Sequence, residues 1–137
     1  EAERLGMADR VMMPGVLRDP ARYIRLFDIF ALSSDSEQYP IALLEAMTSA
    51  LPVVSTDVGD VKNIVARENR PFIIPRTDEA SLAQAIGELA NDAGLREKLG
   101  TANRMLACSS YDEETMFARY RQLYGSAMKR ADFARQS

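Results

Sequence analysis

Residues 28–47 have the sequence DIFALSSDSEQYPIALLEAM, in which two apolar runs flank a polar turn. The first run, residues 28–32, is continuous, which predicts a short strand covered on both faces. Pro40 opens the second run, and because proline is favoured at the first position of a helix, residues 40–50 are predicted to be helical. The stretch is therefore expected to pass from a buried strand through a turn into a helix.

The same alternation of strand and helix extends along the chain. Apolar, β-branched runs predict further strands at residues 52–55 and 71–74, and a short one at residues 10–13. Helices are predicted between them, and apolar residues recur at helical spacing from Leu82 to Ala127. Strands that alternate with helices favour a parallel sheet with right-handed crossovers. The predicted fold class is α/β, a doubly wound parallel sheet with a helical C-terminal third.

No linker, repeat or low-complexity segment divides the 137 residues, so the chain is interpreted as a single domain, 1–137. Residues 1–6 look like the end of a helix whose own strand would lie upstream. The four predicted strands also fall short of the roughly six that a full dinucleotide-type domain carries. We therefore expect a fragment that lacks the first strands of its sheet.

The composition excludes several classes of function. With 17 Lys and Arg against 20 Asp and Glu, the net charge is −3, which gives no basic field for a nucleic acid. The chain has no histidine and one cysteine, so a Ser-His-Asp site, a Cys-His site or an ordinary zinc site cannot form. No apolar run reaches the ~18 residues of a membrane span, and no signal peptide opens the sequence. We expect a cytoplasmic protein without a metal ion or a nucleic-acid partner.

The start of the helix predicted at residues 40–50 offers a place for a phosphate group. It follows the carboxyl end of a strand, where open α/β sheets bind their ligands. Beyond Pro40, the amides of Ile41 and Ala42 come before the first helical hydrogen bonds, and the positive end of the helix dipole lies behind them. Amides in this position suit a phosphate.

Two carboxylates bracket this helix start. Glu45 has apolar neighbours in the sequence, and helical side chains lean toward the N-terminus, so its carboxylate is expected to reach from a buried face toward the helix mouth. There it can accept hydrogen bonds from the vicinal hydroxyls of a ribose. Glu37, in the turn, faces the same crevice. The alternative is that both are solvated carboxylates; a hydrolytic pair is disfavoured because both belong to one short segment.

With these two acidic residues, the segment resembles the E-x7-E element of retaining glycosyltransferases of the GT-B architecture, particularly the large family 4 group. Glu37 and Glu45 are the two glutamates of the motif. The similarity continues through residues 26–34, 43–47, 52–59 and 95–100. The resemblance implies a Rossmann-like half of a GT-B fold, namely the C-terminal domain that binds the nucleotide sugar.

The resemblance also implies an activity and the residues that carry it. The activity is a glycosyltransferase of hexosyltransferase type, which moves a sugar from a nucleotide-diphosphate donor to an acceptor with retention at the anomeric carbon. Glu37 would be the catalytic residue beside the donor sugar, and Glu45 would bind the ribose. The donor-binding backbone would comprise Gln38, Tyr39, Pro40, Ile41 and Ala42. Gln38 departs from the family, in which glycine is frequent at this position.

Two residues near the start of the chain complete the predicted donor site. Gly15 and Val16 follow the strand predicted at residues 10–13, at the end of the sheet where the nucleotide is expected. We expect them to line the pocket of the base.

The predicted partners follow from the same resemblance. They are the nucleotide-sugar donor, an acceptor sugar or lipid-linked glycan, and an N-terminal acceptor-binding domain that is missing here. Without that domain we expect the chain not to turn over. The stripe at Met116, Tyr120 and Leu123 is interpreted as core packing or as a surface for the missing domain. The tail from Met128 to Arg135 mixes cations with apolar residues, which permits contact with the inner face of a membrane.

Two other functions stay open. A Rossmann-type module could bind a nucleotide or a sugar phosphate without chemistry, for which Glu45 and the helix start are sufficient. A nucleotide-sugar epimerase shares the architecture but is disfavoured, since that reaction needs further acidic residues and often a histidine. Glu37 separates a transferase from a binding module, because only a transferase needs a polar group at the sugar.

Overall fold

The structure is a computed structural model that describes residues 1–128. At its centre lies a parallel sheet of three strands in the order β1-β2-β3. The strands comprise Phe30–Leu32, Val53–Thr56 and Ile73–Ile74. Phe30 lies opposite Val53 in the register of the first pair, and Ser55 lies opposite Ile73 in the second. Parallel strands separated by helices confirm the predicted α/β class.

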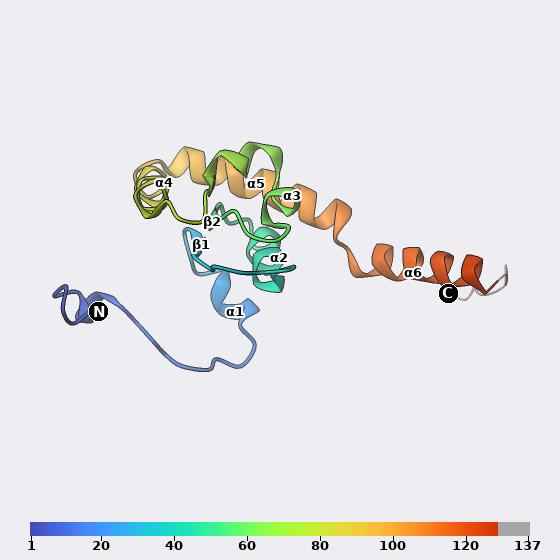
Figure 1. The fold of residues 1–137 in the computed structure, drawn as a ribbon, viewed down its shortest axis with the longest axis horizontal. Coiled ribbons are helices and arrows are strands. Elements are labelled where there is room, and N and C mark those ends of the chain that lie inside the picture. The colour runs from blue at the N-terminus through green and yellow to red at the C-terminus, as the bar shows by residue number, and fades with distance from the viewer. Residues whose placement is uncertain (129–137) are drawn as a thin grey trace.

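Helices connect the strands and then form the C-terminal third of the chain (Figure 1). Helix α2, Ile41–Thr48, joins β1 to β2. The 3-10 helix η2, Arg67–Phe72, and the short helix α3, Val61–Ile64, lie between β2 and β3. The other elements are η1 (Ala8–Arg10), α1 (Ala21–Ile24), α4 (Glu79–Asn91), α5 (Ala93–Ser110) and α6 (Glu113–Ala127).

Each of the three C-terminal helices begins at an aspartate. The side chains of Asp78, Asp92 and Asp112 each accept a hydrogen bond from the backbone amide three residues further on. This bond satisfies one of the amides that the first helical turn leaves unpaired, and the carboxylate charge suits the positive end of the dipole. The aspartates therefore fix where α4, α5 and α6 begin.

The central strand β2 is packed on both faces. Val53 lies in one apolar cluster with Leu43 of α2, and Val54 lies in a second cluster with Leu89 of α4 and Leu99 of α5. Both valines are completely buried. Helices therefore cover the two faces of the sheet, as expected for a doubly wound arrangement.

Strand β1 is covered on one face only. Phe30 and Leu32 are half-buried against the cluster that contains Val53, whereas Ala31 is exposed. The prediction that residues 28–32 are covered on both faces holds for Ile29, which packs against the cluster built on Val54, and was wrong for Ala31, which that cluster does not reach.

Residues 10–13 do not form the predicted strand. Arg10 ends the 3-10 helix η1, and residues 11–13 run in an extended trace that leaves the body of the molecule (Figure 1), where Met12 and Met13 are 88% and 87% exposed. A strand is stabilised by a neighbour that pairs with its backbone, and among residues 1–128 no strand lies beside this segment. The described sheet accordingly has three strands rather than four.

Two buried asparagines hold the start of β2. Asn69 Oδ1 accepts a hydrogen bond from the Val53 amide at 2.9 Å, and Asn69 Nδ2 donates to the Val53 carbonyl at 2.6 Å. Asn103 Oδ1 accepts from the Ala66 amide at 3.1 Å. Asn103 Nδ2 donates to the Leu51 carbonyl at 3.0 Å and to Asn69 Oδ1 at 2.8 Å. Side chains thus satisfy buried backbone groups that no strand or helix pairs.

Helix α5 packs closely at Gly100 against the backbone that follows α2. A Cβ atom added there would overlap the carbonyl oxygen of Ala50 and would lie 2.7 Å from its carbonyl carbon. Ala50 follows the end of α2 with a φ of 59°, the left-handed conformation that often terminates a helix. Only glycine therefore lets α5 pack directly on the backbone at the end of α2.

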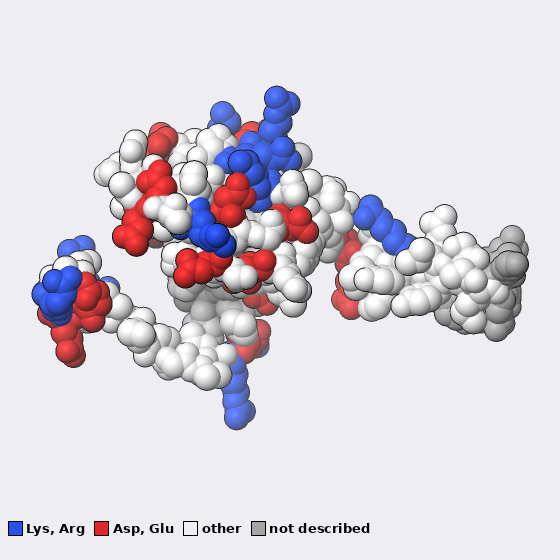
Figure 2. Space-filling model, viewed as in Figure 1, with Lys and Arg blue, Asp and Glu red and all other residues white. Residues whose placement is uncertain are grey.

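Within the described residues, no helix has both the length and the apolar character that crossing a membrane would require. Acidic and basic side chains lie close together over the body of the molecule on the face shown in Figure 2. The basic and apolar tail discussed above falls, from residue 129 onward, outside the described residues.

Candidate functional site

The turn between β1 and α2 is held in place by three hydrogen bonds to its backbone carbonyls. Thr56 Oγ1, at the end of β2, donates to the carbonyl of Ser34 at 2.6 Å. Arg76 Nη1, beyond β3, donates to the carbonyl of Asp35 at 3.2 Å. The Asp60 amide donates to the carbonyl of Gln38 at 3.2 Å. The segments that follow the three strands therefore converge at the carboxyl edge of the sheet.

Gly59 brings the turn close to the segment after β2. A Cβ atom added there would overlap the carbonyl oxygen of Glu37 and would lie 2.6 Å from that of Gln38. Gly59 also has a φ of +51°, which side chains other than glycine adopt at a cost. The position of Glu37 thus depends on a glycine in the next loop.

Gly59→Ala is expected to lower the free energy of unfolding by about 1–2 kcal/mol, because it combines an unfavourable φ with a clash against backbone. Amide hydrogen exchange in residues 33–40 should become faster as the turn is displaced. Gly6→Ala is the control, since Gly6 has a φ of +65° but open space around it. Unchanged exchange in the turn of the Gly59 variant would show that the contact does not hold the turn.

Glu37 lies half-buried in this turn. Ser34 Oγ donates to Glu37 Oε1 at 2.8 Å, which leaves the other carboxylate oxygen available. A carboxylate fixed by one hydrogen bond at a sheet edge can accept a hydrogen bond from a hydroxyl group or stabilise a neighbouring positive charge.

The start of α2 leaves two amides available, as predicted. The first hydrogen bond of the helix joins the Leu43 amide to the Pro40 carbonyl at 3.1 Å, so the amides of Ile41 and Ala42 precede it. Pro40 itself is buried and has a ψ of 111°, so it caps the helix and does not occupy its first position. This places the helix start one residue later than predicted and keeps both amides at the positive end of the dipole.

Glu45 is half-buried, one turn into α2. The apolar neighbours of Glu45 in the sequence predict a buried face, but Ile41 is 70% exposed and Ala42 is also exposed. The first turn of α2 is open because no described segment covers it, whereas Leu43, Ala46 and Met47 are completely buried. The carboxylate therefore has access to solvent and is not enclosed.

Gly15 and Val16 lie apart from the turn before α2 and from the start of α2. They lie in the extended N-terminal trace, where Val16 is 98% exposed and a Cβ added at Gly15 would meet nothing within 4 Å. Neither residue contacts the turn or α2 in the described structure. A role in binding a base stays a prediction.

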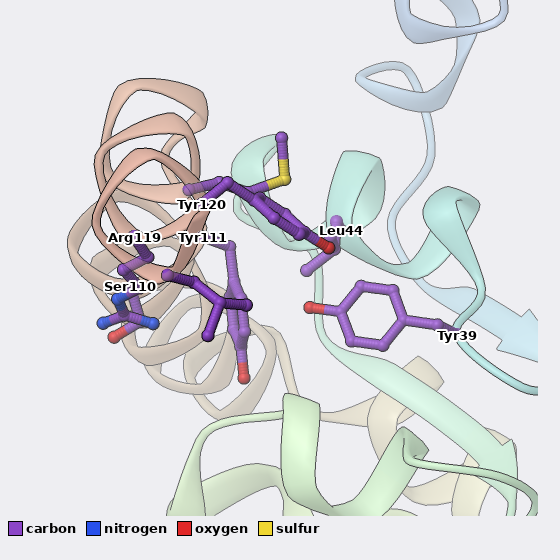
Figure 3. Close-up of a pocket in the computed structure, with 8 residues that line it drawn as sticks. Tyr39, Leu44, Ser110, Tyr111, Arg119 and Tyr120 are labelled. Carbon is purple, nitrogen blue, oxygen red and sulfur yellow. The ribbon is translucent and has the colours of Figure 1, made fainter. Parts of the chain in front are cut away.

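Tyr39 joins the turn to a cavity of about 500 Å³ that the sequence analysis did not predict. The cavity lies between the start of α2, the end of α5 and α6 (Figure 3). Tyr39 packs edge to face on Tyr111, with ring centroids 6.4 Å apart. Burial raises the pKa of the Tyr39 phenol, and the nearby Tyr111 and Asp60 raise it further, because each disfavours a phenolate. The hydroxyl therefore keeps its proton at neutral pH and can donate a hydrogen bond.

Known proteins resemble this chain in sequence. The family model described as "Glycosyl transferases group 1" matches residues 1–92. N-acetyl-alpha-D-glucosaminyl L-malate synthase of Bacillus anthracis is 23% identical over 93% of this chain and 33% of its own length. D-inositol 3-phosphate glycosyltransferase of Streptomyces scabiei is 28% identical over 93% of this chain and 29% of its own length. The chain spans about a third of the length of these curated relatives.

A solved structure agrees with the sequence comparison. Sucrose-phosphate synthase from Thermosynechococcus elongatus superposes with a TM-score of 0.80 and 25% identity, over 91% of this chain and 33% of its own. The parallel sheet and its helices match a Rossmann-like half of the GT-B fold. This chain belongs to the group 1 glycosyltransferases, the family 4 type of the GT-B architecture.

Proposed function

We propose that the chain binds the nucleotide-diphosphate sugar of a retaining glycosyltransferase at the carboxyl edge of its sheet. The observation that carries the proposal is the turn held by Thr56, Arg76 and Asp60, which leads directly into the two available amides of α2. An anchored turn with amides at a helix start is a preorganised place for phosphate.

Each part of the site has a proposed role. The amides of Ile41 and Ala42 bind diphosphate oxygens and stabilise the charge that develops on the leaving nucleoside diphosphate. Glu45 accepts hydrogen bonds from the ribose hydroxyls. Glu37, oriented by Ser34, contacts the donor sugar. The proposed reaction uses no metal ion, and a cytoplasmic location stays a prediction.

The names of the relatives suggest the class of acceptor. Two of these names contain L-malate and D-inositol 3-phosphate, which are small hydroxylated anions. We propose this class for the present chain beside the predicted acceptor sugar or lipid-linked glycan, since the names of other relatives contain a capsular polysaccharide and an O-antigen chain. An acceptor-binding domain in the full-length protein remains part of the proposal.

Glu45→Gln is expected to weaken the binding of a nucleoside diphosphate by about 1–3 kcal/mol, because the amide is a weaker acceptor for the ribose hydroxyls than a carboxylate. Calorimetry with UDP, GDP and ADP measures the effect. Glu97→Gln, at an exposed position of α5, is the matched control. Equal affinities in the Glu45 variant and the wild type would remove Glu45 from the ribose role.

Glu37→Gln is expected to lower kcat of the full-length protein about tenfold or more, with less than a twofold change in nucleotide affinity, because its proposed contact is with the sugar. Initial rates at saturating donor, together with the calorimetry above, separate these effects. Glu68→Gln, on the exposed side of η2, is the control. A loss of nucleotide affinity at constant kcat would favour the binding module over the transferase.

A further inference from the structure

The cavity beside Tyr39 has the size and lining of a small-molecule site. Its volume of about 500 Å³ falls within the ~300–1,000 Å³ of typical ligand pockets. Leu44 of α2 and Met116 of α6 supply apolar walls, and the rings of Tyr39, Tyr111 and Tyr120 supply aromatic ones. Such walls favour a ligand with an apolar face, such as the C–H face of a sugar or cyclitol ring.

The cavity also holds polar groups that can orient such a ligand. Figure 3 shows the hydroxyl groups of Tyr39 and Tyr120 directed into the space from opposite walls. Neither hydroxyl makes a hydrogen bond to another residue of the described part of the chain. Each can therefore donate to, or accept from, a hydroxyl group of the ligand.

One cation completes the lining. The Arg119 side chain lies beside Ser110, on the side away from Tyr39 (Figure 3). It makes no ion pair with any residue between 1 and 128. A guanidinium group with unused donors at the edge of an apolar cavity favours a ligand that carries a carboxylate or a phosphate.

We infer that this cavity binds a small hydroxylated compound with one anionic group, with the ring against the tyrosines and the anion at Arg119. Tyr39 precedes the capping Pro40, so the cavity adjoins the start of α2, where the donor is proposed to bind. Because the proposed function, on which the position of the donor rests, places acceptor binding on another domain, the cavity is a second site beside the donor and its ligand is not assigned as the acceptor. The binding itself depends only on the cavity.

The experiment is a titration of the chain with glucose 6-phosphate, with glucuronate and with glucose. Saturation-transfer difference NMR monitors the binding of each compound. These probes present a phosphate, a carboxylate and no charge on the same ring. Arg119→Gln should weaken the binding of the preferred anionic probe about fivefold or more and leave glucose unchanged. Arg121→Gln, which removes a cation from the same helix outside the cavity, should change no affinity more than about twofold. Tyr120→Ala should weaken all three probes.

Titrations with UDP, GDP and ADP on the same samples separate the two proposals. Binding of an anionic probe in the presence of a saturating nucleotide, with the losses above, supports the inference. The inference is overturned if a nucleotide displaces the anionic probe, if Arg119→Gln leaves the affinity for that probe unchanged, or if no probe binds. If no nucleoside diphosphate binds while the anionic probe does, the cavity assignment stands and the proposed function fails.

Discussion

Gly100→Ala is expected to lower the free energy of unfolding of this chain by about 3 kcal/mol or more. The added methyl group would overlap the Ala50 carbonyl oxygen, which belongs to the backbone and cannot rotate away as a side chain can. The helices α2 and α5 would have to separate, and apolar packing around Leu43 and Met47 would be lost. Urea denaturation followed by circular dichroism measures the change.

Gly87→Ala is the matched control for this variant. Gly87 lies inside helix α4, and a Cβ added there would meet nothing within 4 Å. Because alanine favours helix more than glycine does, this substitution should raise the stability by about 0.5–1 kcal/mol. Equal stability of the two variants would contradict the close approach of α5 to the end of α2.

Asn103→Leu is expected to lower the free energy of unfolding by about 3 kcal/mol, because it leaves the buried Ala66 amide and Leu51 carbonyl without partners. The leucine side chain has the same branching and the same number of non-hydrogen atoms and leaves no cavity, so the loss arises mainly from hydrogen bonding. Urea denaturation measures this effect as well.

Asn91→Leu is the control for the asparagine. Asn91 Nδ2 donates to the Gly87 carbonyl at 2.8 Å on an exposed surface, where water can replace the bond. The expected change is below about 0.5 kcal/mol. A loss below 1 kcal/mol in the Asn103 variant would mean that the amide network does not hold the start of β2.

Elements that depend on local pattern were predicted well. The apolar spacing of Leu82, Ile86 and Leu89 gives α4 one face that packs on Val54, and a single face is sufficient to define a helix. The run predicted as a strand at residues 52–55 likewise overlaps the buried central strand, Val53–Thr56. In both cases the information lies within the element itself.

Features that depend on distant segments were not predicted. The extended run at residues 10–13 has strand-like residues, but its conformation depends on a neighbour that supplies hydrogen bonds. Asn69 and Asn103 are separated by 34 residues, and nothing in their local sequence distinguishes them from surface asparagines. The cavity requires that α2 and α6 lie near each other. The aromatic stripe of α6 predicts an apolar face, but the spacing of apolar residues does not show which helix that face lies near.

The candidate site was predicted in part. The helix start and its two amides follow from Pro40, because proline fixes the local geometry. The exposure of Ile41 could not be predicted, since it depends on what covers the first turn of α2. Arg76 was missed because an isolated arginine after a strand carries no motif.

The turn before α2 is anchored through the carbonyl oxygens of Ser34, Asp35 and Gln38, so its attachment is independent of the side chains at the positions in between. Replacements at residues 36 and 38 can therefore change the side chains that the turn presents while its backbone path stays the same. Under the proposed contact of this turn with the donor sugar, sugar preference would change through such replacements with no change of fold.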